Sequence, residues 1–153
     1  MENQEFKIRI DATREKVWSI LWDDVTYRQW SSVFSEGSWA ETDWQKGSKV
    51  LFLDDNYCGM VATIAEIIPY EFMSFKHLGT VDDGEEDTES EHVKEWSGAL
   101  ENHTLETVDG KTELTINIDV TEELKDYFLN VWPEALKKIK ELAETSPVLS
   151  PVV

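Results

Sequence analysis

The C-terminal part of the chain carries the pattern that most constrains the fold, a long amphipathic helix. Apolar side chains recur at three- and four-residue steps from Leu124 to Ala143, forming one continuous stripe along a helix. Thr121 offers an N-cap oxygen, glutamates follow it, and lysines lie near the negative end. Each large side chain contributes about 1.5 to 3 kcal/mol when fully buried. The rest of the chain must therefore supply a surface that covers this stripe.

The segment from about residue 36 to 120 predicts that surface, an antiparallel sheet. Short β-branched and aromatic runs are separated by turn-forming residues, which indicates a meander of about six strands. Asp109-Gly110 is a good hairpin turn because both positions tolerate positive φ. From Leu114 to Val120 apolar and polar residues alternate, so one face of the last strand is expected to be exposed to solvent.

The N-terminal segment predicts a further strand at about 5–11 and two short helices, at about 14–21 and 24–33. The sum is an α+β fold: a curved antiparallel sheet of about seven strands wrapped around the C-terminal helix, with two short helices between strands one and two. No repeat or Gly-rich linker divides the chain. We therefore expect a single domain at 1–146 and a C-terminal tail at 147–153.

The charge of the chain argues against anionic partners. Lys and Arg number 14 against 32 Asp and Glu, a formal net charge of −18. Such a field repels phosphate backbones and anionic lipid, so neither nucleic acid nor membrane is an expected partner. It can favour cationic ligands or a basic protein, although acidic balance often serves only solubility.

An acidic start, no membrane-length apolar run and a lone Cys58 together predict a cytoplasmic protein.

The segment 81–91 concentrates this acidity around Gly84. It holds seven Asp and Glu residues and presents no apolar face. Because like charges repel, the segment is predicted to be a mobile, solvated loop. Its spacing lacks the ordered ligands of an EF-hand, so no calcium site is expected there.

Several local strings of the chain are informative beside the order of its elements. They are 12–18 (ATREKVW), Trp30, Gly47, 64–69 (IAEIIP), Trp96, 104–106 (TLE), 110–114 (GKTEL) and 132–137 (WPEALK). Together with the order of elements, they resemble the START-like superfamily, also called SRPBCC, and within it the family related to the activator of heat-shock protein 90 ATPase. This resemblance implies a helix-grip fold with a cavity between the sheet and the C-terminal helix. The superfamily includes lipid and hormone binders, polyketide cyclases and co-chaperones, so the resemblance does not fix a mechanism.

Candidate ligand-binding residues follow from strand alternation and from the family analogy. One strand is expected to point Met73, Phe75 and His77 inward, opposite two aromatic residues of the helix. The chain has seven tryptophans, which either fill the core or line a cavity with an N–H for a polar ligand atom. The candidates are Trp18, Trp30, Phe52, Met73, Phe75, His77, Trp96, His103, Phe128 and Trp132.

Catalytic, metal and cofactor sites are not predicted. His77 and His103 lie in strands, where each is either a buried acid–base group or a hydrogen-bonded structural residue. His92 is expected to be exposed. The histidines and Cys58 show no metal-ligand spacing, and Cys58 is interpreted as a small buried residue of a strand. Neither a Gly-rich phosphate loop nor a nucleophile elbow is found.

The leading hypothesis is a non-catalytic binding module whose cavity takes an apolar or aromatic small molecule. One alternative is an enzyme of cyclase or hydratase type that uses a cavity acid–base residue. The other is a co-chaperone-like domain whose acidic surface meets a protein partner.

Overall fold

The computed structural model describes residues 1–145 of the 153-residue chain. The tail expected at 147–153, and its boundary with the domain, lie outside these residues. The elements follow in the order β1 (Glu2–Ile10), α1 (Arg14–Trp22), α2 (Asp24–Ser31), β2 (Trp39–Glu41), β3 (Lys49–Leu53), β4 (Gly59–Ile68), β5 (Phe72–Asp82), β6 (Glu85–Asp87), α3 (Glu91–Lys94), β7 (Leu100–Val108), β8 (Lys111–Val120) and α4 (Glu122–Thr145).

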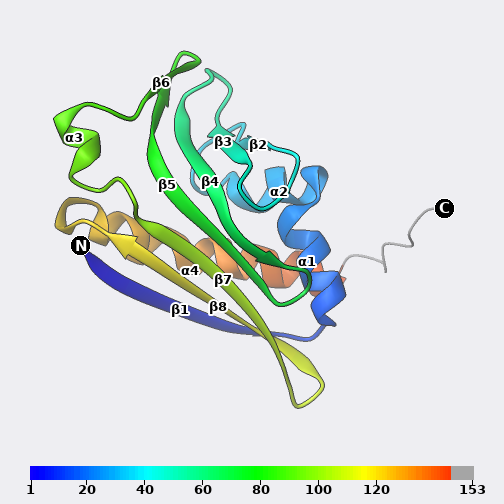
Figure 1. Ribbon diagram of the computed structural model, residues 1–153. Coiled ribbons are helices and arrows are strands. Elements are labelled where there is room, and N and C mark those ends of the chain that lie inside the picture. Colours follow the sequence, from blue (N-terminus) through cyan, green and yellow to red (C-terminus); the bar gives the residue numbers. More distant parts are fainter. Residues whose placement is uncertain (146–153) are drawn as a thin grey trace.

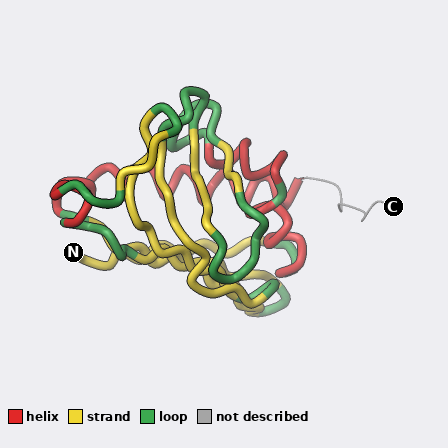
Figure 2. Tube along the Cα trace, turned by 45° about the horizontal axis from the view of Figure 1, so that its top comes forward, coloured by secondary structure: helices red, strands yellow, loops and turns green. Residues whose placement is uncertain are grey.

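The strands form one antiparallel sheet, and α4 crosses one of its faces (Figure 1). The strand order is β1-β8-β7-β5-β4-β3-β2, with β6 paired to the end of β5. The trace of Figure 2 shows how strongly this sheet curves. Both short helices contact α4. The predicted α+β helix-grip architecture is therefore confirmed, with the two short helices between the first two strands.

The β7–β8 hairpin confirms the turn that the sequence predicts. Val108 pairs with Lys111, and the two residues between them have positive φ, 52° at Asp109 and 78° at Gly110. This geometry matches the twist of the flanking strands. The long strands that it joins carry inward-facing residues to the centre of the sheet.

Helix α4 begins as its sequence predicts but does not bury its whole apolar stripe. Thr121 Oγ1 accepts a hydrogen bond from the Leu124 N–H at 3.3 Å, which confirms the cap. In the half that precedes Pro133, Leu124 is 41% exposed and Tyr127 is 44% exposed. The expectation of a fully docked stripe is wrong at these two positions, because both side chains line a pocket instead of packing into the core. The buried residues of the whole helix are Trp132, Ala135, Leu136, Ile139 and Ala143.

The acidic segment 81–91 is more regular than predicted. Its residues form the short strand β6 and the start of α3. Asp83 and Gly84 both have positive φ, so the chain reverses tightly and Glu85–Asp87 pairs with the end of β5. Backbone pairing needs no apolar face, and the charge of Glu86 is offset by Lys49 Nζ at 2.9 Å. The interpretation of the whole segment as a loop was therefore wrong, whereas most of its residues are solvent-exposed as expected.

Within residues 1–145, no helix is both long enough and apolar enough to cross a membrane. The main hydrophobic core fills the space between the sheet and the helices α1, α2 and α4. Leu53, Val61 and Val81 form a smaller cluster of their own. The site described next lies beside the main core, at the end of the sheet where α4 begins.

Candidate functional site

A pocket of about 570 Å³ lies among the sheet, α2 and the first half of α4. Strands β3, β4, β5, β7 and β8 provide one wall, and helices provide most of the other. The wall is rich in aromatic rings because the curved sheet and the half-docked helix leave large side chains facing each other across a gap. These rings belong to Trp22, Tyr27, Trp30, Phe34, Phe52, Trp96, Tyr127, Phe128 and Trp132.

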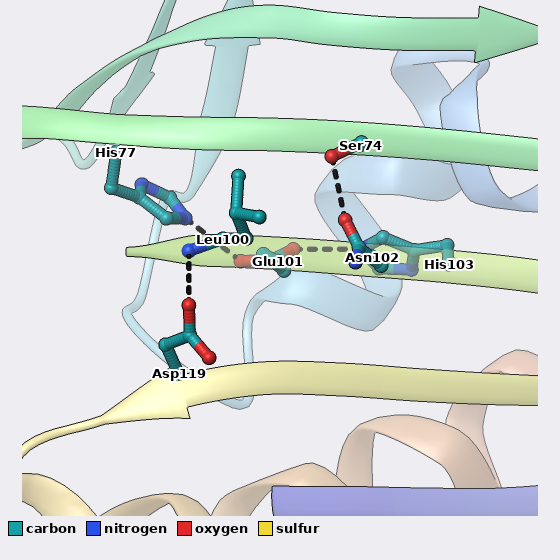
Figure 3. Close-up of polar contacts among 7 residues, drawn as sticks. All are labelled: Ser74, His77, Leu100, Glu101, Asn102, His103 and Asp119. Atoms are coloured by element: carbon teal, nitrogen blue, oxygen red, sulfur yellow. Dashed lines mark hydrogen bonds and ion pairs between the residues drawn. The ribbon is translucent and has the colours of Figure 1, made fainter. Parts of the chain in front are cut away.

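Glu101 lines this pocket, and its carboxylate lies between two histidines (Figure 3). Its Oε1 lies 3.1 Å from His77 Nε2, and its Oε2 lies 2.7 Å from His103 Nε2. Glu101 and His103 are two residues apart on β7, so alternation turns both toward the core. His77 comes from β5, where its backbone N–H donates to Ala99 O at 2.8 Å. The two neighbouring strands thereby fix a His–Glu–His cluster.

The cluster keeps its carboxylate ionised. Burial acts to raise the pKa of Glu101, but hydrogen bonds from His103 and His77 outweigh it and hold this pKa well below the usual range. An ionised carboxylate only accepts hydrogen bonds, so each histidine carries a proton on Nε2. Each oxygen then keeps one unused lone-pair direction. The side chain remains 15% accessible, and it lines the pocket.

We expect Glu101 to stay charged where an ordinary glutamate, with a pKa near 4.3, takes up its proton. A lowered pKa in the folded state stabilises the fold at pH values above the unfolded-state pKa. This stabilisation is lost only as the pH falls through the folded-state pKa. A ¹³C NMR titration of the Glu101 carboxyl carbon should therefore give a flat response from neutral pH to about pH 4. A midpoint at the ordinary value would contradict the cluster.

His103 holds Glu101 from the core side. Its side chain is fully buried, and its ring lies edge-on to Trp22 at 4.9 Å, with Phe75 at 6.0 Å and Trp132 at 5.8 Å. Packing on these rings fixes the orientation of the imidazole. The Nδ1 atoms of both cluster histidines are buried without a hydrogen-bond partner among the described residues.

The structure brings six of the ten candidate residues to the pocket. Trp18, Met73, Phe75 and His103 do not line it. The last three are buried in the main core, and Phe75 is covered by Trp22 at a centroid distance of 5.4 Å. Trp18 is partly buried at the edge of this core. The candidates that line the pocket are Trp30, Phe52, His77, Trp96, Phe128 and Trp132.

Sequence reasoning missed Glu101 and Tyr27. Glu101 could have been found from the alternation of β7. It is separated by two-residue steps from His103 and Leu105, so all three side chains are expected on the inward face of the strand. Tyr27 lies in a helix whose pattern is weak, and its contribution depends on tertiary packing. Cys58 was misplaced, since it lies in the turn before β4 and is half-buried rather than in a strand interior. His92 is exposed as expected, at the mouth of the pocket.

Two carboxylates accompany Glu101 in the pocket lining, Asp54 and Asp119. Asp119 Oδ2 accepts the Leu100 N–H at 2.9 Å, which ties the ends of β7 and β8 together (Figure 3). Asp54 Oδ1 accepts the backbone N–H of Asn56 at 2.8 Å. Within residues 1–145, no group of three or more His, Cys, Asp or Glu is placed to hold a metal ion.

A family model described as "Activator of Hsp90 ATPase homolog 1-like protein" matches residues 11–144. A comparison with curated proteins found no match. Solved structures do match, and at these low identities their likeness shows the fold. The Aha1 dimer from Colwellia psychrerythraea is 19% identical with a TM-score of 0.71, covering 95% of this chain and 98% of that one. CalU16 from Micromonospora echinospora is 16% identical with a TM-score of 0.67, covering 98% of this chain and 70% of that one.

Proposed function

The chain belongs to the Activator of Hsp90 ATPase homolog 1-like family, whose model matches residues 11–144, and we propose that it is a binding module for an apolar or aromatic small molecule. One observation carries the proposal: the pocket of about 570 Å³ combines an aromatic wall with the ionised, buried carboxylate of Glu101. Small-molecule sites are concave and largely apolar, with a few polar groups that set orientation. Glu101 is that polar group here.

A native mass spectrum tests the proposed function. The protein is purified gently from its native host, and its spectrum is compared with that of the denatured chain. An added mass that disappears on denaturation supports a bound small molecule and begins its identification. A bare chain counts against a tightly held ligand.

Filling the pocket should abolish uptake of an apolar probe. Met60 lies on β4 and lines the pocket, so Met60→Trp places a larger ring in it. We expect binding of the neutral dye N-phenyl-1-naphthylamine, followed by its fluorescence, to weaken about tenfold or more, or about 1.4 kcal/mol. Ala65→Trp is the matched control, because Ala65 is an exposed residue of the same strand. Equal binding by both variants would show that the dye binds elsewhere.

Acid–base catalysis on the bound molecule is the second candidate, favoured by the contact between His77 and Glu101 in the pocket wall. An imidazole titrates near neutral pH and can move a proton to or from a bound group. The chemical identity of the ligand after incubation with the protein distinguishes the two candidates. A catalyst converts the ligand to a different molecule, whereas a binding module leaves it unchanged.

A further inference from the structure

We infer that the pocket selects a protonated amine carried on an apolar or aromatic body, with Glu101 as the group that receives the ammonium. This inference rests on the proposed function and names the class of ligand. It starts from the charges around the pocket. The lining holds the carboxylates of Asp54, Glu101 and Asp119, and among the described lining residues there is no Lys or Arg.

Glu101 is arranged to receive a hydrogen-bond donor. His77 and His103 hold one oxygen each, at 3.1 and 2.7 Å, so the carboxylate is fixed before a ligand arrives. The free lone pair on each oxygen and the 15% accessible surface leave room for an N–H from the pocket side. The hydrogen bonds from the two imidazoles leave one side of each carboxylate oxygen open toward the pocket. A ligand ammonium there would donate a charge-assisted hydrogen bond to Glu101, which is stronger than a hydrogen bond from a neutral donor.

Aromatic rings next to Glu101 suit the same group. Tyr27 lies close enough for the negative charge of Glu101 to raise its pKa further, beyond the effect of burial. Its ring stands 5.0 Å from Trp30 and 6.4 Å from Phe52. A cation near ring faces is attracted by their quadrupoles, most strongly where water is excluded. An ammonium at Glu101 would thus contact a carboxylate and aromatic rings together, while its apolar body packs on the α4 side of the pocket.

The charge of the whole chain acts in the same direction. A net charge of −18 raises the local concentration of cations and lowers that of anions. This general field favours any cation at any surface, whereas Glu101 favours one at a single position. The experiment must therefore separate the local carboxylate from the global field.

Three naphthalene probes of matched shape make this separation. They are 1-naphthylmethylamine, 1-naphthalenemethanol and 1-naphthoic acid, which are cationic, neutral and anionic at neutral pH. Isothermal titration calorimetry should show the amine binding at least about tenfold more tightly than the alcohol, and the acid most weakly. In Glu101→Gln the amine should fall to the level of the alcohol. The matched control is Asp109→Asn, which removes an equal charge from an exposed hairpin turn outside the pocket.

The outcomes distinguish amine selection by Glu101 from apolar binding alone and from the effect of the net charge. Equal binding of amine and alcohol by the wild-type protein overturns the inference but leaves apolar binding standing, and failure of all three probes overturns both. A preference that falls equally in Asp109→Asn assigns the selectivity to the global field and overturns the role of Glu101. If Glu101→Gln does not fold, the wild-type protein still decides: the amine, and not the alcohol, should shift the His77 imidazole ¹⁵N resonances.

Discussion

Replacing Ile139 with alanine is expected to lower the free energy of unfolding by about 2 to 5 kcal/mol. Ile139 is 0% exposed and lies in the half of α4 that is packed into the main core. The substitution removes three methyl or methylene groups and leaves a void that dense neighbours fill only in part. Urea unfolding followed by far-UV circular dichroism measures the loss. Because the pocket lies at the other half of the helix, binding of N-phenyl-1-naphthylamine should persist while the variant stays folded.

Leu129→Ala is the matched control for this result. Leu129 belongs to the same helix and is 39% exposed, and it does not line the pocket. Its loss should change stability by less than about 1 kcal/mol, as for most surface substitutions. Similar costs at the two positions would contradict the uneven docking of α4.

Glu101→Leu is expected to cost about 2 to 4 kcal/mol of stability, although leucine suits an apolar surrounding. The change leaves the Nε2 protons of His77 and His103 buried without their acceptor. Each unsatisfied buried group costs about 1 to 3 kcal/mol, and hydrophobic gain at one position returns only part of that. Urea unfolding at neutral pH measures the effect.

A second substitution tests the reason for this cost. His103→Phe in the Glu101→Leu background removes one stranded donor and places a ring among the aromatic side chains that already enclose His103. The double variant should recover part of the lost stability, because replacing both partners with apolar groups costs less than stranding one. A double variant less stable than Glu101→Leu alone would show that His103 contributes through something other than Glu101.

Local patterns predicted the elements of this fold well. The Thr121 cap and the Asp109-Gly110 turn act over a few residues, so the sequence contains all the information that they need. Segment 81–91 was misjudged because its charge pattern says nothing about a backbone reversal at Asp83 and Gly84, where positive φ permits strand pairing.

The pocket itself depends on contacts that a single sequence does not reveal. The apolar stripe of α4 is continuous, yet Leu124 and Tyr127 stay partly exposed beside the pocket, and only the packing of the whole domain decides that. Periodicity correctly turned His77 toward the interior but could not distinguish the pocket wall from the sealed core that holds Phe75. Strand alternation would have placed Glu101 on the inward face. It was missed because a charged residue was assumed to be exposed.

The two halves of α4 also constrain how this protein can diverge. The half after Pro133 anchors the helix through Leu136 and Ile139, so substitutions there carry a folding penalty. Leu124 and Tyr127 in the first half line the pocket and stay 41% and 44% exposed. Substitution there should reshape the pocket at a smaller cost to stability than substitution at Ile139. Changes in the shape of the pocket should therefore accumulate on one side of a single proline, while the scaffold on the other side stays constant.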